Sequence, residues 1–258
     1  MESSTGFDPI ILSPEDYATL GEEQFGVPGL VATELIGPFV RIRASGPLIM
    51  VHDGVFEAGH GIGHHPHRMN ERLFYILQGA VDHDDALNGI TGHMGTGDLG
   101  RLTEGRRGML HKEWNNSGGR ARAFILVYET DPVPERASFA ALRDGEAPRY
   151  EEGEGVMTKE LVGPRSPLQV RGDIRLFTDS YLEPGARLGV VAEAGEGGLV
   201  VPIEGQLAVA QHDSLSPGRA MVLPPARSPR SLSLLASTGA RVLRVIHGAG
   251  YGLVVADP

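Results

Sequence analysis

The sequence contains no cysteine in its 258 residues, which excludes disulfide bonds and thiolate metal ligands. Lysine and arginine form no cluster longer than a pair, and the formal net charge is −10 at pH 7. An acidic surface without a basic patch repels both a phosphate backbone and an anionic membrane. We therefore expect no direct nucleic-acid binding and no membrane association, and any redox chemistry has to reside in a bound metal or a substrate.

Long apolar runs are absent too: none reaches the roughly 18 residues that a membrane-spanning helix needs. The first nine residues, MESSTGFDP, are polar and acidic rather than a hydrophobic leader. These two observations predict a cytoplasmic protein. The chain is long enough for one large domain or for two of about 100 to 150 residues.

What the sequence has is a regular succession of short apolar segments. From residue 31 onward they are rich in β-branched and aromatic residues, and glycine-containing turns separate them roughly every 8 to 12 residues. This spacing predicts antiparallel strands in a sandwich or barrel. Two segments depart from it: SPED at 13–16 predicts a short helix over residues 14–19, and SFAALRD at 138–144 has a helical pattern within a proline-rich connection.

The strand pattern occurs twice. Residues 201–225 match residues 74–105 if the first copy carries a longer loop. A repeat of this length is an architectural unit, so we predict an all-β chain of two tandem antiparallel barrels. The predicted division is an N-terminal barrel over 1–135, a linker over 136–145 and a C-terminal barrel over 146–258.

Two short motifs in the first half indicate a metal site. In a strand, residues two apart point to the same face, so His65 and His67 of HPH present two imidazoles side by side. His111 and Glu113 of HKE repeat that spacing on a later segment. If these strands are adjacent or facing, three imidazoles and one carboxylate converge, a set that suits Fe, Ni, Cu, Mn or Zn.

The same residues resemble a known family. The pattern G-x5-H-x-H-x3-E from residue 59 to residue 71, a GD turn at 97–98 and then H-x-E at 111–113 is similar to the two motifs of the cupin superfamily. More narrowly, HPHR, YILQG and H-x-E resemble the pirin family of bicupins. The second repeat has no HxH, so we expect the C-terminal barrel to lack such a metal site.

The pirin resemblance implies a mononuclear iron, with Zn, Mn, Ni or Cu as alternatives. Its ligands would be His65, His67, His111 and Glu113. Some pirin-like proteins have quercetin 2,3-dioxygenase activity, in which dioxygen opens the flavonol ring with loss of carbon monoxide. The resemblance therefore implies a small aromatic substrate, with Glu113 accepting the substrate's hydroxyl proton and Glu71 supporting the site from behind the ligands or from the pocket wall. The alternatives are a non-catalytic iron-dependent regulator that docks a protein partner such as a transcription factor, and an isomerase or sugar-binding cupin.

The sequence departs from the family pattern at two places: GRRGMLH has one extra residue between Gly105 and His111, and Asn70 replaces an aromatic residue. Aromatic or soft side chains that could line a pocket are Phe74, Tyr75, Met94 and Trp114, of which alternation allows only some to face inward. The acidic run DHDD at 82–85 is typical of a solvated hairpin.

Overall fold

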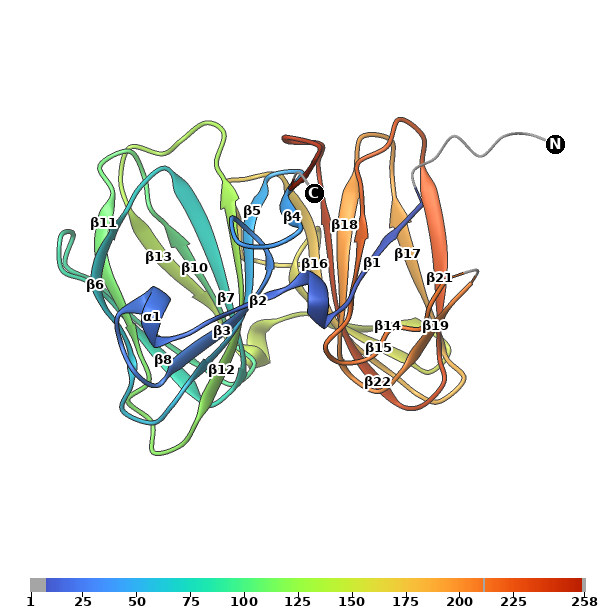
Figure 1. Ribbon diagram of the computed structural model, residues 1–258, viewed down its shortest axis with the longest axis horizontal. Coiled ribbons are helices and arrows are strands. Elements are labelled where there is room, and N and C mark those ends of the chain that lie inside the picture. Colours follow the sequence, from blue (N-terminus) through green and yellow to red (C-terminus); the bar gives the residue numbers. More distant parts are fainter. Residues whose placement is uncertain (1–7, 211, 257–258) are drawn as a thin grey trace.

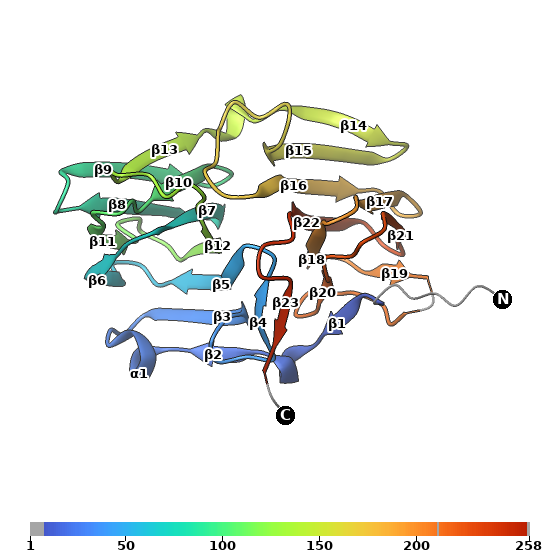
Figure 2. The same cartoon turned by 90° about the horizontal axis from the view of Figure 1, so that it is seen from above.

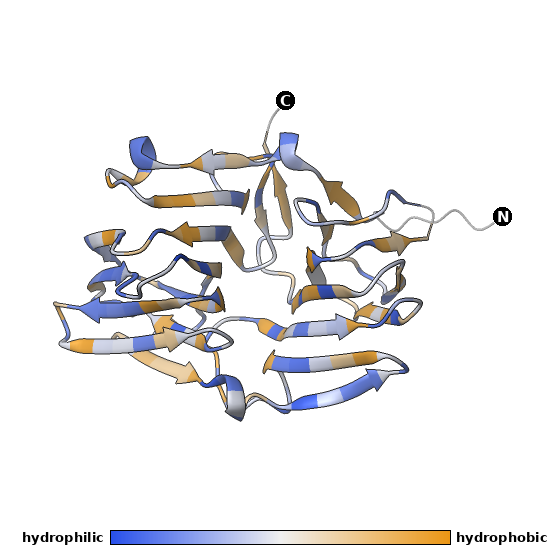
Figure 3. Cartoon of the chain, turned by 90° about the horizontal axis from the view of Figure 1, so that it is seen from below, coloured by the Kyte–Doolittle hydropathy of each residue, from blue (hydrophilic) through white to orange (hydrophobic). Residues whose placement is uncertain are grey.

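The computed structural model describes residues 8–210 and 212–256, so most of the polar segment MESSTGFDP lies outside the described residues. Two β-barrels lie side by side, joined along one long face (Figure 1). The predicted all-β, two-barrel architecture is thereby confirmed. Coloured by hydropathy, the strands are banded along their length, as expected where successive side chains face opposite sides of a sheet (Figure 3).

Each half of the molecule combines one large and one small antiparallel sheet. In the N-terminal half the large sheet has the order β13 (Ser138–Leu142), β10 (Leu99–Thr103), β7 (Asn70–Gln78), β12 (Ala121–Glu129), β5 (Leu48–Phe56), β3 (Leu30–Ile36) and β2 (Ala18–Leu20), with β4 (Ile42–Ser45) and β23 (Leu253–Val255) attached through β5. The small sheet has the order β6 (Gly61–His67), β11 (Met109–Trp114), β8 (Ala80–Asp85) and β9 (Ile90–Gly95).

The C-terminal half repeats this plan. Its large sheet has the order β1 (Ile10–Leu12), β20 (Ala220–Leu223), β18 (Gly197–Glu204), β22 (Ala240–His247), β16 (Ile174–Leu182), β15 (Val156–Val162) and β14 (Arg149–Gly153). Its small sheet has the order β17 (Arg187–Ala192), β21 (Arg230–Ala236) and β19 (Leu207–Val209). Apart from the edge strands β13 and β1, the strands at equivalent positions in the two large sheets follow one another in the same order along the chain. The internal repeat seen in the sequence is therefore a repeat of topology.

The two halves exchange strands at their edges. β1 precedes the first barrel in sequence but pairs with β20 of the second, and β23 follows the second barrel but pairs with β4 of the first (Figure 2). β13 lies inside the expected linker, but it pairs with β10 and forms an edge of the large sheet of the first barrel. The helical interpretation of SFAALRD is wrong, because a free sheet edge offers this segment a full ladder of backbone hydrogen bonds. The predicted domain boundaries stay a prediction.

Helical structure is limited to α1 (Glu22–Phe25) and two 3₁₀ turns, η1 (Pro14–Asp16) and η2 (Asp144–Glu146), within the described part of the chain. The helix expected over residues 14–19 is one turn shorter than predicted. Tyr17 is already extended, with φ −103° and ψ 163°, because the following residues pair as β2 with β3. No helix in the described residues has the length and apolar character needed to span a bilayer.

Three hydrophobic clusters hold the molecule together. One fills the N-terminal barrel and one the C-terminal barrel, while the largest lies between them and draws on both large sheets, including Tyr75 and Phe124 from one and Phe177 and Val245 from the other. The barrels therefore share a core. Because β7 and β12 have buried side chains on both faces, their central residues form nearly continuous apolar runs in the sequence.

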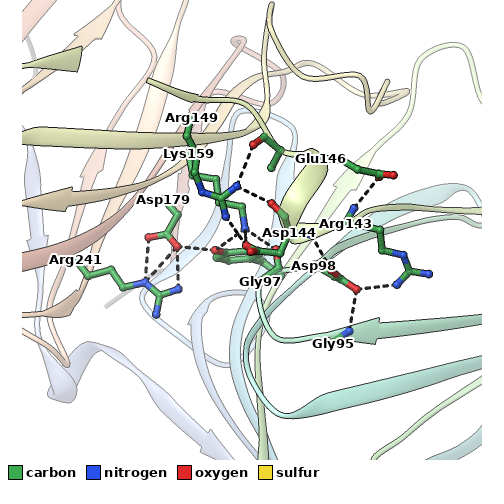
Figure 4. A network of polar contacts seen from close by, with 12 residues as sticks. Gly95, Gly97, Asp98, Arg143, Asp144, Glu146, Arg149, Lys159, Asp179 and Arg241 are labelled. Carbon is green, nitrogen blue, oxygen red and sulfur yellow. Dashed lines mark hydrogen bonds and ion pairs between the residues drawn. The ribbon is translucent and has the colours of Figure 1, made fainter. Parts of the chain in front are cut away.

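A polar network crosses the same junction (Figure 4). Tyr75 of the first barrel donates its hydroxyl to Asp179 Oδ2 of the second at 2.5 Å. Arg241 completes the pairing by donating Nη2 to Asp179 Oδ2 at 2.8 Å. Lys159 donates Nζ to the carbonyl of Gly97 at 2.6 Å, and burial lowers the pKa of this lysine. The junction is thus fixed in register by directed contacts as well as by apolar packing.

His247 gives the junction a predicted pH dependence. It is fully buried, with Nε2 3.2 Å from Ser45 Oγ and Nδ1 2.8 Å from the carbonyl of Gly248. Burial lowers its pKa below the ordinary value of 6.5. The unfolded chain therefore binds a proton at this residue more readily than the folded chain, so the stability associated with neutral His247 is complete above pH 6.5 and is lost as the pH falls below it.

Between pH 7 and pH 5 the unfolding free energy of the wild-type protein should fall as the pH falls, and His247→Gln should reduce the slope of this fall. The reduction is at most the effect of one proton taken up on unfolding, about 1.4 kcal/mol per pH unit. Urea unfolding at the two pH values measures this. His93→Gln is the matched control, since the His93 side chain is 62% exposed, and it should change the slope less than His247→Gln does. An unchanged slope in His247→Gln would contradict the assignment.

Candidate metal centre

The HPH and HKE motifs lie on neighbouring strands of the small sheet in the N-terminal barrel, on the side away from the second barrel (Figures 1 and 2). β6 and β11 pair antiparallel with His65 opposite His111. Alternation turns His65 and His67 inward on β6, and His111 inward on β11. The ring centroids are 4.7 Å apart for His65 and His67, 4.5 Å for His65 and His111, and 5.0 Å for His67 and His111.

Glu113 lies two residues beyond His111 on the same face of β11 and is only 2% exposed. Its Oε1 is 2.6 Å from His111 Nδ1 and 3.1 Å from His83 Nδ1. The potential ligand atoms fall into two overlapping groups, His65, His67 and His111 in one and His83, His111 and Glu113 in the other. The structure thus brings the three predicted histidines together and joins Glu113 to them through His111; the four-ligand set stays a prediction.

His83 is a site residue that sequence reasoning missed. The DHDD run forms the end of β8, which pairs with β11 so that His83 stands opposite Glu113. The run lies in the hairpin of β8 and β9, as predicted, but only Asp82 and Asp84 reach solvent, whereas His83 is 2% exposed and Asp85 fully buried. The signal was alternation from Val81, which places Val81, His83 and Asp85 on one inward face.

The donor set fits a divalent transition metal. Nε2 of His83 and both ring nitrogens of His111 are buried without a hydrogen-bond partner among the described residues, because the His111 ring is not aligned for a hydrogen bond to Glu113. Buried nitrogens are normally paired, since leaving one unpaired costs about 1–3 kcal/mol. A metal ion bound by these imidazoles would remove that cost. The unpaired nitrogens therefore indicate that the cluster binds a metal ion.

Protonation states also suit metal binding. Burial lowers the pKa of His65, and burial together with the Arg72 guanidinium lowers that of His67 to about 3. Burial alone would raise the pKa of Glu113, but the imidazoles of His111 and His83 outweigh it and hold that pKa far below its usual range. At neutral pH His65 and His67 are therefore neutral and Glu113 is ionised, the states in which these residues bind metal.

The cluster faces a cavity of about 360 Å³ between the small sheet and the large sheet of this barrel. His65, His67 and Glu113 line it together with the rings of Phe25, Phe39, Phe56 and Phe74 and with aliphatic side chains. Of the four aromatic or soft side chains predicted to line a pocket, Phe74 lines this cavity. Tyr75 instead packs between the barrels, Met94 lies in the core beside Gly100, and Trp114 is on the outward face of β11.

Glu71 does not line this cavity, so its predicted place on the pocket wall is wrong. On β7, Arg72 and Phe74 face the cavity, whereas Glu71 points to the opposite side, toward the second barrel. There it is fully buried and accepts hydrogen bonds from the hydroxyls of Tyr128, at 2.8 Å, and Thr103, and from the backbone N–H of Arg171, at 2.7 Å. With its oxygens occupied this way, Glu71 is a structural residue of the junction.

Arg72 supplies a cation to the cavity wall that the sequence did not indicate. Its Nε donates to Glu104 Oε1 at 2.7 Å, and Glu104 Oε2 accepts the backbone N–H of Asn70 at 3.0 Å. Glu104 is fully buried, so the pair fixes the guanidinium in place. A guanidinium with Nε occupied still offers its terminal nitrogens, which suits an anionic oxygen on a ligand.

The extra residue between Gly105 and His111 is absorbed before β11 begins. Arg106 and Arg107 form a turn whose backbone N–H groups bond to the carbonyls of Pro134 and Glu135. Gly108 ends the turn with φ +79°, and a Cβ there would lie 2.6 Å from the carbonyl oxygen of His67. His111 therefore keeps its register opposite His65, and the insertion leaves the histidine cluster intact.

Sequence comparison connects this site with known proteins. Residues 23–126, which contain every residue of the cluster, match the family model described as Pirin. The chain is 32% identical over 137 residues to quercetin 2,3-dioxygenase of Escherichia coli (strain K12), covering 52% of this chain and 53% of that protein. It is 32% identical over 152 residues to Pirin-1 of Arabidopsis thaliana, covering 55% and 50%. The match spans about half the length of these curated relatives.

Solved structures extend the likeness to the whole fold. The crystal structure of GK1651 from Geobacillus kaustophilus superimposes with a TM-score of 0.78 at 20% identity, covering 96% of each chain. Bacterial pirin YhhW from Escherichia coli, in complex with nickel(II), superimposes with a TM-score of 0.76 at 18% identity, covering 93% of this chain and 99% of that one. Residues 23–126 are thus similar in sequence to the family described as Pirin, and the fold of the chain is similar to that of bacterial pirin YhhW.

Proposed function

We propose that this protein is a mononuclear iron dioxygenase that acts on quercetin or a similar flavonol or polyphenol. The observation that carries the proposal is the position of the histidine cluster, which opens into a largely apolar pocket between the two sheets of the barrel. The cavity volume of about 360 Å³ is at the lower end of the range for small-molecule sites. Relatives named quercetin 2,3-dioxygenase support the choice of substrate.

His65, His67 and His111, with Glu113, would hold the ion. When bound, the ion supplies the Lewis acidity and redox capacity that these side chains lack. The chain's own residues bind and orient the substrate: the rings of Phe25, Phe56 and Phe74 offer flat apolar surfaces that exclude water from an aromatic molecule.

Two charged residues would handle the acidic oxygen of the substrate. The Glu113 carboxylate faces the cavity beside the imidazoles, where it accepts the proton of the incoming hydroxyl. The Arg72 guanidinium, fixed by Glu104, lines the same cavity and favours the resulting anion. A flavonol meets both requirements, since it combines a flat apolar ring system with an acidic enolic hydroxyl.

The test is dioxygen uptake by the iron-loaded protein in the presence of quercetin. Glu113→Gln is expected to lower the uptake rate by about 100-fold or more while retaining part of its metal, because an amide coordinates weakly but cannot accept a proton. Metal content and oxygen consumption are measured on the same samples. Glu57→Gln is the matched control, since Glu57 is 45% exposed in its pair with Arg120 and lies outside the cavity.

If iron-, manganese-, copper- and nickel-loaded samples all fail to consume dioxygen with a panel of flavonols, the dioxygenase proposal falls. The metal-dependent regulator that docks a protein partner is then the function to test. Equal loss of metal and activity in Glu113→Gln would instead show that this residue acts as a ligand alone.

A further inference from the structure

A second polar cluster lies in the wall of the same cavity, away from the histidine cluster. Glu34 on β3 and His52 on β5 are directly opposite each other in the large sheet, and both line the cavity. Glu34 Oε2 is 3.0 Å from His52 Nε2, and Glu34 Oε1 accepts the backbone N–H of Phe39 at 2.7 Å. Glu34 is fully buried and the His52 side chain is 9% exposed.

The position of this pair relative to the metal cluster follows from strand pairing. His52 stands opposite Ile125 on β12, which stands opposite Phe74 on β7, and all three line the cavity. The pair therefore belongs to the large-sheet wall, whereas His65 and His67 belong to the small-sheet wall that faces it. Facing sheets are about 10 Å apart, so one small molecule can touch both walls.

The hydrogen bonds of Glu34 determine what His52 offers. A carboxylate oxygen accepts hydrogen bonds, so the neutral form of His52 donates Nε2–H to Glu34 and presents Nδ1 as an acceptor. No described residue is a hydrogen-bond partner of Nδ1. Burying a carboxylate and a histidine in an apolar wall is costly, and hydrophobic residues would pack there as well or better. Packing of the barrel wall alone therefore does not explain why Glu34 and His52 occupy these positions.

We propose that His52, oriented by Glu34, is a hydroxyl-recognition point of the cavity: Nδ1 accepts a hydrogen bond from a hydroxyl group at the end of the ligand remote from the metal cluster. The inference rests on the proposed function and narrows its substrate class to aromatic compounds hydroxylated at both ends. His52 is a positioning residue here. Phe39 lines the same cavity, is 64% exposed, and donates its backbone N–H to Glu34. The pair therefore lies next to the open side of the cavity, where such a ligand would enter.

The test compares two ligands that share the metal-chelating hydroxyl and carbonyl but differ in the rest of the molecule. Quercetin carries hydroxyl groups besides the chelating one, whereas 3-hydroxyflavone carries only the chelating hydroxyl. Dissociation constants are measured anaerobically on metal-loaded protein, so no turnover occurs. Wild-type protein should bind quercetin about tenfold more tightly than 3-hydroxyflavone, and His52→Leu should abolish this difference by weakening quercetin alone. His52→Gln should keep part of the difference, because its amide can donate to Glu34 and accept from the ligand.

A structural role for the pair predicts something else: His52→Leu would weaken both ligands equally or lower stability, with the preference for quercetin retained. That result overturns the proposal. Equal binding of the two ligands by the wild-type protein also overturns it, while leaving the proposed function standing.

A second measurement depends neither on flavonols nor on a folded variant. In ¹⁵N-labelled, zinc-loaded wild-type protein, adding catechol should shift the Nδ1 resonance of His52, whereas benzene should not. If flavonols fail to bind but catechol gives this shift, the proposed flavonol activity falls and the recognition point stands for smaller hydroxylated aromatics. If catechol and benzene act alike on His52, the recognition point is excluded.

Discussion

Replacing His111 by alanine is expected to remove the bound metal from the purified protein while both barrels stay folded. His111 belongs to both groups of potential ligand atoms, and it is fully buried between His65 and Glu113. Loss of an outer-shell partner already costs about 10- to 100-fold in metal affinity, so loss of this imidazole should cost about 100-fold or more. Metal content per chain after dialysis measures the effect.

The fold should survive because the cores are built elsewhere. The apolar cluster of the N-terminal barrel and the shared cluster between the barrels contain no member of the histidine cluster. His93→Ala is the matched control: His93 lies on the same small sheet, but its side chain is 62% exposed and pairs with Asp82. Full metal occupancy in His111→Ala, with unchanged circular dichroism, would show that the ion binds elsewhere.

The parts of the site that the sequence predicted are those governed by local alternation. His65 and His67 share a face of β6, and His111 and Glu113 share a face of β11, because residues two apart in a strand always do. The tandem motifs and the repeat then gave the architecture. These inferences needed no knowledge of what packs on the other side of any strand.

Orientation failed where a strand is buried on both faces. Seven consecutive residues of β7, from Glu71 to Leu77, are buried, so hydrophobic alternation could not tell which face meets the cavity. Glu71 was therefore placed in the pocket, although Arg72 and Phe74 are the residues that line it. The Glu34–His52 pair was missed for a related reason, because the two residues are 18 positions apart and only strand pairing joins them.

The exchange of edge strands was also beyond local reasoning. β1 and β23 are three-residue strands whose partners lie about 200 residues away, and no periodicity in so short a segment identifies a partner. Their pairing nevertheless ties each barrel to the chain end of the other. Together with the shared core it joins the two barrels through a large buried junction, in which Asp179 is a fully buried carboxylate.

Asp179→Ala is accordingly expected to lower the free energy of unfolding by about 3–5 kcal/mol, because it leaves a buried partner charge and a buried hydroxyl uncompensated. Asp179 is fully buried and joins Tyr75 of one barrel to Arg241 of the other (Figure 4). Asp179→Asn should cost less, since the amide still accepts one hydrogen bond. Asp213→Ala, which removes a 76%-exposed carboxylate paired with Arg219, is the matched control and should stay within about 1 kcal/mol of wild type. Urea unfolding, followed by fluorescence and by circular dichroism, measures the free energy of unfolding of all three variants. If Asp179→Ala lowers it no more than the control does, apolar packing alone holds the barrels together.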